Sequence, residues 1–297
     1  MSPVTSGPAA DVLPPLSPPS PPQTKTRPPL RIAILLNSYR SRLLPAIRAS
    51  YERTIGAVAP DAQLAFYEPA NNYRDDDSRF PDPAYFDLVV LGGGNVDPRK
   101  SHPWILDVHA FLRRLVARHP GKKVLGICWG HQTIARVFGG KVVDAAYPEM
   151  GVATIDLTEA GRQFFFFPEA AAAGSLRLQQ HHRREVAAAA PAFAQLARGN
   201  QCLLSESNTV LTFQGHPEKD AETARLRLHD AARWYGLRMI DDGGDSDGAL
   251  DEKAWARLEA MITAEHDGPA VWRRILEWVW EPPVLGKGLE VDRLSRM

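Results

Sequence analysis

Residues 124–140, VLGICWGHQTIARVFGG, decide the fold: an apolar run ends at a cysteine, and a helical pattern follows within a few residues. A tight turn between a strand and a helix pushes the side chain at its tip out of the sheet, and the start of the helix offers free backbone amides and a positive dipole end. Gly126 and Gly130 would relieve the crowding of such a turn. We therefore expect Cys128 to be a nucleophile whose thiolate is favoured near neutral pH. The alternative is a small buried cysteine that only packs.

The first half of the chain alternates short apolar runs with helical patterns. Buried strands are predicted at residues 30–36, 62–67, 86–91 and 123–127, and helices at residues 41–58, 104–117 and 133–138. The glycines at 92–94 are expected to end the third strand, and residues 73–79 to form a charged loop. Strands that alternate with helices predict an α/β fold with an open, mostly parallel sheet covered by helices on both faces.

The pattern changes after residue 140. Shorter strands at 142–143, 151–157 and 176–179 suggest a small antiparallel sheet, and strands at 193–197, 201–205 and 210–213 follow. Helices are predicted at 221–235, 252–264 and 270–280, with a Gly/Asp loop at 241–247. The last helix carries an apolar stripe that is expected to pack on the core rather than bind a partner: Val271, Ile275, Trp278 and Val279.

The N-terminal segment differs in composition from the rest of the chain. Residues 1–29 contain ten prolines, which predicts a disordered tail with polyproline II character, either a linker or a ligand of an SH3-type domain. We expect three regions: the tail at 1–29, a single domain at 30–281 and a C-terminal extension at 282–297.

Charge and cysteine content restrict the classes of partner and compartment. The 35 basic and 35 acidic residues balance, so no overall field favours nucleic acid or a membrane surface, and we expect neither as a partner. Two cysteines cannot form a disulfide framework, and neither a signal peptide nor a membrane span is visible. A cytoplasmic location is the expectation.

A candidate base for the cysteine comes after the last predicted strand. His216 follows the apolar residues 210–213, so it would lie at the same carboxyl edge of the sheet as Cys128, where open α/β sheets bind ligands. Pro217 holds the backbone extended, and Glu218 can then point to the same side as His216. A carboxylate there could fix the tautomer of the imidazole and stabilise its protonated form.

With both motifs identified, the chain resembles the class I, or triad, glutamine amidotransferase family. GICWGHQ at 126–132 resembles the family's nucleophile motif, and GHPE at 215–218 resembles its His-x-Glu motif. LGGGN at 91–95 resembles the Gly-rich oxyanion turn. PWIL at 103–106 and TFQGHPE at 212–218 are typical of stand-alone members that resemble the amidotransferase half of GMP synthase, a group that includes fungal proteins and plant γ-glutamyl peptidases.

The resemblance covers roughly residues 31–236 and implies a flavodoxin-like fold and roles for individual residues. It implies a catalytic triad of Cys128, His216 and Glu218. It also implies an oxyanion hole made by the backbone amides of Gly93 and Trp129, and substrate contacts from the side chains of Gln132 and His182. One departure is that Arg184 stands where the family usually has Asp, in the segment 180–186 that helps to form the glutamine site. No cofactor or metal is implied, because His181 and His182 are adjacent on a strand and point to opposite faces.

The expected activity is hydrolysis of the γ-amide of glutamine or of a γ-glutamyl compound through a cysteine thioester. The chain has no Gly-x-x-x-x-Gly-Lys-[Ser/Thr] motif and no spare length for an acceptor domain, so ammonia would pass to a separate acceptor or synthetase protein. Two alternatives stay open, a γ-glutamyl peptidase acting on glutathione or its conjugates and a non-catalytic binding or regulatory module. Gly-x-Cys-x-Gly elbows also occur in cysteine peptidase-like folds, which the placement of His216 disfavours.

Overall fold

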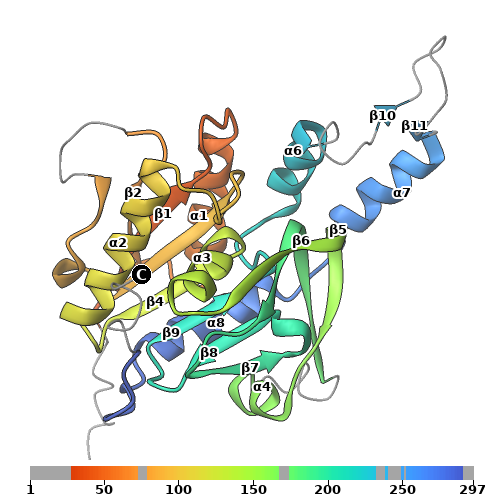
Figure 1. Ribbon diagram of the computed structural model, residues 1–297. Helices are drawn as coiled ribbons and strands as arrows, with labels where there is room; N and C mark the ends of the chain where they lie inside the picture. The colour runs from red at the N-terminus through yellow and green to blue at the C-terminus, as the bar shows by residue number, and fades with distance from the viewer. Residues whose placement is uncertain are drawn as a thin grey trace, which may run out of the picture.

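Seven strands form the central sheet, in the order β2-β1-β3-β4-β9-β8-β7 (Figure 1). The computed structural model describes residues 28–72, 79–166, 174–231, 238–239, 249–250 and 252–289. The five neighbouring strands from β2 to β9 pair in parallel. At the other end of the sheet, β8 pairs antiparallel with β9, and β7 pairs antiparallel with β8. Their bounds are β1 Arg31–Asn37, β2 Gln63–Tyr67, β3 Leu88–Gly94, β4 Lys123–Ile127, β9 Val210–Phe213, β8 Cys202–Ser205 and β7 Phe193–Ala197.

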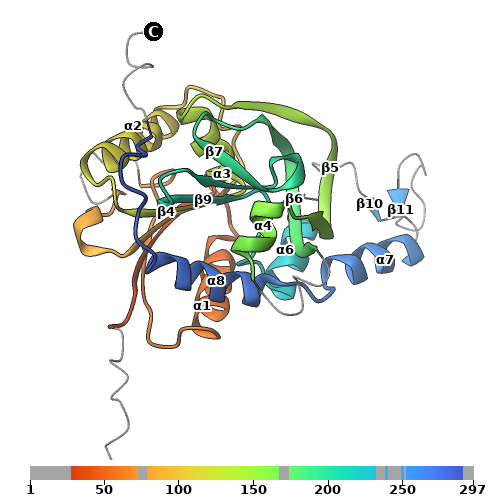
Figure 2. The same ribbon diagram turned by 90° about the horizontal axis from the view of Figure 1, so that it is seen from below.

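Helices cover both faces of this sheet (Figure 2). On one face lie α1, Leu44–Gly56, and α8, Gly268–Val279; on the other lie α2, Pro103–Arg118, and α3, Trp129–Val137. Outside the central sheet and the β5–β6 pair described below, the further described elements are α4 Glu159–Phe164, α6 Ala221–Ala231, α7 Glu252–Ile262, the short turns η2 Pro83–Tyr85 and η3 Arg198–Asn200, and the two-residue strands β10 Arg238–Met239 and β11 Ala249–Leu250. The predicted α/β class and its helices on both faces are confirmed.

Two apolar clusters hold the helices to the sheet. Tyr51 of α1 and Trp272 of α8 are fully buried in one cluster, and Trp104 of α2 packs in the other. The predicted stripe on the last helix lies in the first cluster: Val271, Ile275, Trp278 and Val279. Packing of the stripe on the core is therefore confirmed.

A second, two-stranded antiparallel sheet lies beside the central one, formed by β5, Lys141–Asp156, and β6, Ser175–Ala188. The expectation of short strands here is wrong, because the two strands pair over almost their full lengths, with an irregularity between Asp144 and Glu149. This long ladder matters for the site, since Gln179 of β6 bridges to His216 and brings the small sheet against the end of β9.

The predicted end of the third strand is also wrong. β3 continues through all three glycines to Gly94, because Gly94 still pairs with Asn37 of β1. No helix in the described part of the chain is long and apolar enough to cross a bilayer. Most of the predicted tail, the charged loop and the Gly/Asp loop lie outside the described residues, at 1–27, 73–78 and 241–247.

Candidate active site

Cys128 lies at the tip of a sharp turn between β4 and α3. Its backbone has φ 50° and ψ −99°, a conformation that costs energy for any residue with a Cβ. The flanking glycines have no room for side chains: a Cβ on Gly130 would lie 2.0 Å from the Leu91 carbonyl oxygen, and one on Gly126 would lie 2.6 Å from Ile134 Cδ1. The turn predicted from the sequence is present, and both glycines are required by close approach.

The sulfur of Cys128 is enclosed and protonated. Its side chain is buried, and Sγ lies 3.9 Å from the carbonyl oxygen of His181. Burial raises the pKa of the thiol to about 11, and the positive charge of Lys219 and the backbone amide of Trp129 only partly oppose this effect. The expectation of a thiolate near neutral pH is therefore wrong for this conformation, because removal of water outweighs the helix start and the cation.

His216 and Glu218 form a buried pair at the end of β9. His216 Nδ1 lies 2.7 Å from Glu218 Oε1, with both side chains nearly inaccessible to solvent. Burial, followed by the charge of Lys219, lowers the pKa of His216 to about 4, so the imidazole is neutral. With Nδ1 donating to the carboxylate, Nε2 is left as a proton acceptor, and it has no hydrogen-bond partner in the described part of the chain.

The backbone of Glu218 is fixed by helix α1. Ser50 Oγ donates a 2.6 Å hydrogen bond to the Glu218 carbonyl oxygen, and Thr54 Oγ1 donates one of 3.0 Å. Further along the segment, Ser50 Oγ also accepts from the Asp220 backbone amide. These bonds connect the predicted His-x-Glu segment to helix α1 on one face of the sheet, and they were not visible in the sequence.

The Gly-rich end of β3 approaches both His216 and the turn at Cys128. A Cβ on Gly93 would lie 3.0 Å from His216 Cε1, and one on Gly94 would lie 2.8 Å from Trp129 Cγ. Gly93, Gly94, Cys128 and His216 line the same pocket. The glycines thus let the strand end and the imidazole close around the cysteine.

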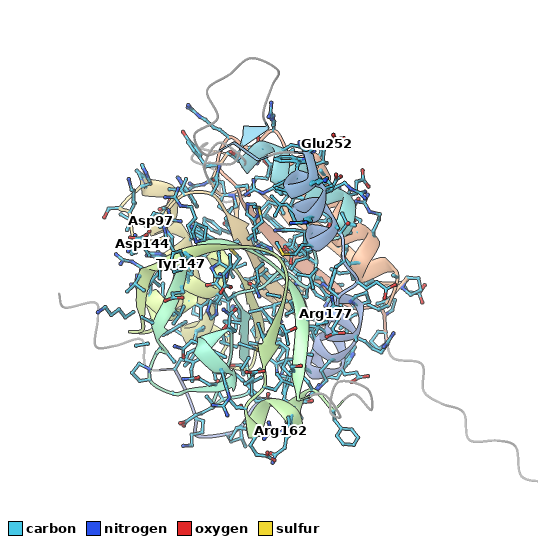
Figure 3. The ribbon with its side chains drawn as sticks, turned by 90° about the vertical axis from the view of Figure 1, so that its right-hand side faces the viewer. Asp97, Asp144, Tyr147, Arg162, Arg177 and Glu252 are labelled. Atoms are coloured by element: carbon cyan, nitrogen blue, oxygen red, sulfur yellow. The ribbon has the colours of Figure 1, made fainter. Side chains whose placement is uncertain are left out.

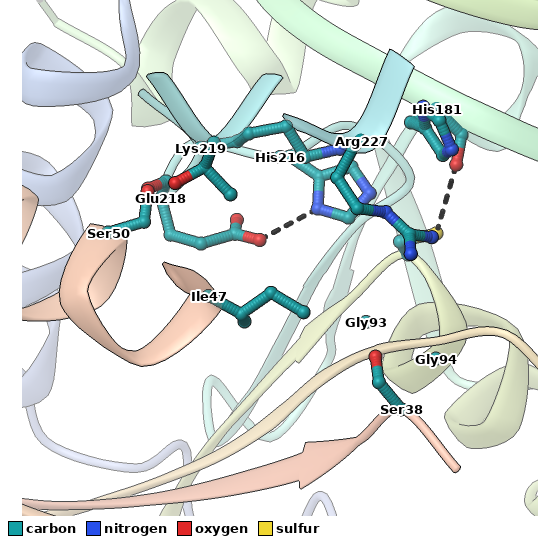
Figure 4. Close-up of a pocket in the computed structure, with 12 residues that line it drawn as sticks. Ser38, Ile47, Ser50, Gly93, Gly94, His181, His216, Glu218, Lys219 and Arg227 are labelled. Carbon is teal, nitrogen blue, oxygen red and sulfur yellow. Dashed lines mark hydrogen bonds and ion pairs between the residues drawn. The ribbon is translucent and has the colours of Figure 1, made fainter. Parts of the chain in front are cut away.

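Two cations that the sequence analysis missed complete this pocket (Figure 4). Lys219 is buried directly after Glu218, and Arg227 reaches the pocket from α6. Burial lowers the pKa of Lys219 to about 8, so the ammonium is charged at neutral pH. The position of Lys219 next to the His-x-Glu motif was a usable signal, whereas nothing local marked Arg227.

The pocket is small in this conformation. Its enclosed volume is about 40 Å³, room for one to a few water molecules and less than a glutamine needs. Other lining residues come from the loop after β1, from α1, from β6 and from α6: Ser38, Ile47, Ser50, His181 and Thr223. Entry of a molecule the size of glutamine would therefore require these walls to move.

The two side chains expected to contact substrate are engaged elsewhere. Gln132 Nε2 donates to the Arg184 carbonyl oxygen at 2.8 Å and to Gln214 Oε1 at 3.1 Å, and neither Gln132 nor His182 lines the Cys128 pocket. His182 is buried with Nε2 3.0 Å from Glu149 Oε2. In this conformation Gln132 acts as a core amide, because Arg184 of β6 and Gln214 after β9 accept its hydrogen bonds.

The departure at Arg184 has a local explanation. Arg184 Nε lies 3.2 Å from Asp97 Oδ2 and 3.8 Å from Asp144 Oδ1, and Arg99 pairs with the same two carboxylates. Figure 3 shows Asp97 and Asp144 close together at one edge of the molecule. Arg184 therefore joins a balanced ion-pair cluster instead of the Cys128 pocket.

Within the described ranges, no group of three or more His, Cys, Asp or Glu side chains is arranged to hold a metal ion. Both cysteines are free thiols, and Cys202 is buried in the central sheet. The chemistry available at the pocket is that of a neutral thiol, a neutral imidazole oriented by a carboxylate, and two nearby cations.

Comparisons with known proteins identify the family of the sequence. The sequence model of the family described as glutamine amidotransferase class-I matches residues 67–231. The glutamine amidotransferase-like protein chyE of Penicillium rubens is 37% identical over 198 residues, 66% of this chain and 80% of that protein. Gamma-glutamyl peptidase 4 of Arabidopsis thaliana is 33% identical over 158 residues, 51% of this chain and 62% of that protein.

The solved structures show the same fold. The crystal structure of a glutamine amidotransferase from Thermotoga maritima matches with a TM-score of 0.57 at 15% sequence identity, covering 85% of this chain and 99% of the other. At this identity the likeness concerns the fold alone.

Proposed function

Because the chain belongs to the class I glutamine amidotransferase family, we propose that it cleaves the γ-amide bond of glutamine or of a γ-glutamyl compound through a thioester on Cys128. The observation that carries the proposal is the buried 2.7 Å contact between His216 and Glu218 in the pocket that also holds Cys128. We assign Cys128 as nucleophile, His216 as general base and then acid, and Glu218 as the group that orients the imidazole.

Each step uses the protonation states described above. As Sγ attacks the γ-carbonyl carbon, the thiol proton passes to Nε2 of His216, so the thiolate never needs to exist at rest. The carbon–nitrogen bond then breaks, and the imidazolium gives its proton to the departing amine. Water attacks the thioester with His216 again as base, which releases glutamate and restores the thiol.

The developing oxyanion needs donors that are already in place. We propose the backbone amides of Gly93 and Trp129, since Gly93 lies against His216 and Trp129 opens helix α3 directly after the nucleophile. Gln132 and His182 are kept as proposed substrate contacts that would require the pocket to open.

We also propose that the catalytic domain spans residues 30–281, with a tail before it and an extension after it.

Two fates of the amine fit these residues. Ammonia from glutamine could pass to a separate acceptor or synthetase protein, or the enzyme could hydrolyse γ-glutamyl peptides, a reading supported by the similarity to gamma-glutamyl peptidase 4. Two free thiols suit a reducing compartment such as the cytosol. A non-catalytic role has less support, because a binding module has no physical need for a strained cysteine turn.

The test is to incubate the purified full chain with glutamine, glutathione and γ-glutamyl dipeptides and to quantify glutamate, ammonia and released amine. Cys128→Ala should abolish turnover of every donor, while Cys202→Ala, the matched change at the other buried cysteine, should retain it. Release of amine from glutathione without ammonia would favour the peptidase, and activity only with an added partner would favour the amidotransferase subunit. Turnover by Cys128→Ala would refute the mechanism.

A glutamine-analogue electrophile gives an independent measure. Labelling of Cys128, located by peptide mass spectrometry, is expected for either enzyme. Absence of labelling together with absence of turnover would favour the non-catalytic role.

A further inference from the structure

A second cavity lies at the same edge of the sheet as the Cys128 pocket. Its volume is about 440 Å³, which is the size of a small-molecule site, and the loops after β1, β2 and β3 enclose it. The two cavities are neighbours along the chain: Ser38 lines the first and Tyr39 the second, and Gly94 lines the first and Val96 the second. A ligand there would lie beside the candidate nucleophile without occupying its pocket.

The loop that forms one wall is fixed from two sides. Asn95 Oδ1 accepts from the Tyr39 backbone amide at 2.9 Å, and Asn95 Nδ2 donates to the Tyr39 carbonyl oxygen at 2.9 Å. Asn71 Oδ1 accepts from the Arg40 backbone amide at 2.7 Å. Arg40 has φ 49°, in the left-handed region, so these bonds hold a conformation that the residue would otherwise avoid.

The aromatic side chains of the wall are also held in place. The rings of Tyr39 and Trp104 are stacked, with centroids 6.4 Å apart and an interplanar angle of 13°. Trp104 in turn stacks on Trp129, the residue after the nucleophile, at 5.3 Å and 27°. Three rings therefore run from the second cavity to the Cys128 turn.

The polar residues that line the cavity in the described part of the chain are cationic or neutral. The Arg40 guanidinium lies 5.0 Å from the centre of the Tyr39 ring and makes no ion pair with the described residues. His102 and Asn71 also line the cavity, and none of its described lining residues is a carboxylate. A guanidinium held over the ring of an aromatic wall suits an anion attached to a planar group, because the planar group packs against the aromatic wall while the guanidinium pairs with a carboxylate.

We propose that this cavity binds a small aromatic carboxylate as a second ligand of the protein. Tyr39 and Trp104 supply the aromatic wall that contacts the ring of the ligand, Arg40 pairs with the carboxylate and His102 adds a further donor. Only the suggestion that the ligand lies next to the acyl group on Cys128 rests on the proposed function. The binding itself does not depend on turnover.

The test is a titration of the full chain by isothermal calorimetry with three acids or amides of similar size. We expect saturable binding of 3-phenylpropionate and at least tenfold weaker binding of 3-cyclohexylpropionate, which cannot stack, and of 3-phenylpropanamide, which has no charge. Equal affinity for all three, or no binding of 3-phenylpropionate, would overturn the proposal.

Variants locate the ligand. Arg40→Met should weaken binding of 3-phenylpropionate at least tenfold and leave the alkylation rate of Cys128 unchanged, because the Arg40 side chain lies outside the Cys128 pocket. Arg118→Met is the matched control, since Arg118 lines a different hollow that is also lined by aromatic rings, those of Phe80 and Phe111. Equal weakening by the two variants would place the ligand elsewhere and refute the assignment. A chain that binds the acid but turns over no γ-glutamyl donor would refute the proposed function alone.

Discussion

Replacing Glu218 with glutamine tests the role of the carboxylate, because the variant keeps the shape of the side chain and removes its charge. The bond to His216 is 2.7 Å long, and both side chains are more than nine-tenths buried, so solvent screens it little. A hydrogen bond to a charged group contributes about 1.5–3 kcal/mol. If that stabilisation is realised when the imidazolium forms, kcat/KM should fall roughly 10- to 150-fold, at 1.36 kcal/mol per tenfold.

The assay is kcat/KM of the purified variants for the γ-glutamyl donor that the unmodified chain turns over best, measured between pH 5 and 9. Glu281→Gln is the control, since it makes the same change at a carboxylate 2.6 Å from Arg274, outside the Cys128 pocket. The negative charge of Glu218 raises the pKa of His216, so its removal should move any acid limb to lower pH. Unchanged activity, or a loss as complete as that of Cys128→Ala with the Tm preserved, would refute the reasoning.

Three further outcomes follow from the same contacts. Lys219→Met removes a charge that lowers the pKa of Cys128, so carboxamidomethylation of Cys128 by iodoacetamide at pH 7.5 should slow roughly tenfold for each unit of pKa gained; an unchanged rate would contradict this. Gly130→Ala places a Cβ 2.0 Å from a backbone oxygen and should lower the free energy of unfolding in urea by about 3 kcal/mol, while Gly56→Ala, with open space around it, should not lower it. The pKa of His216 falls from 6.5 in the unfolded chain to about 4 in the folded one, so its contribution to stability is complete above pH 6.5 and is lost as the pH falls toward 4. The expected loss in the free energy of unfolding is about 3 kcal/mol, and urea unfolding that shows no such loss would argue against it.

Local sequence was enough to predict the sharp turn at Cys128 and the position of His216 at the same edge of the sheet. The turn at Cys128 depends on a strand, a helix and two glycines that are adjacent in the chain, and His216 follows an apolar strand whose carboxyl end must share an edge with β4. Glu218 is two residues from His216, so its orientation also follows from local geometry. Each of these positions is set by backbone rules that act over a few residues.

Distant contacts account for what the sequence could not predict. Gln132 was expected to meet substrate, but its amide bonds to the backbone of Arg184, which arrives through the long β5–β6 ladder. Arg227 enters the pocket only because α6 packs there, and the high pKa of Cys128 results from the closure of all these walls. Burial is a property of the assembled structure, so a motif cannot reveal it.

The small volume of the Cys128 pocket affects how readily Cys128 is oxidised while no ligand is bound. Oxidation of cysteine by peroxide proceeds through the thiolate and requires access of the oxidant. Cys128, with a pKa of about 11 inside a cavity of about 40 Å³, offers little of either. The resting protein should therefore resist inactivation by peroxide, and the period of greatest chemical risk coincides with the opening that admits the substrate.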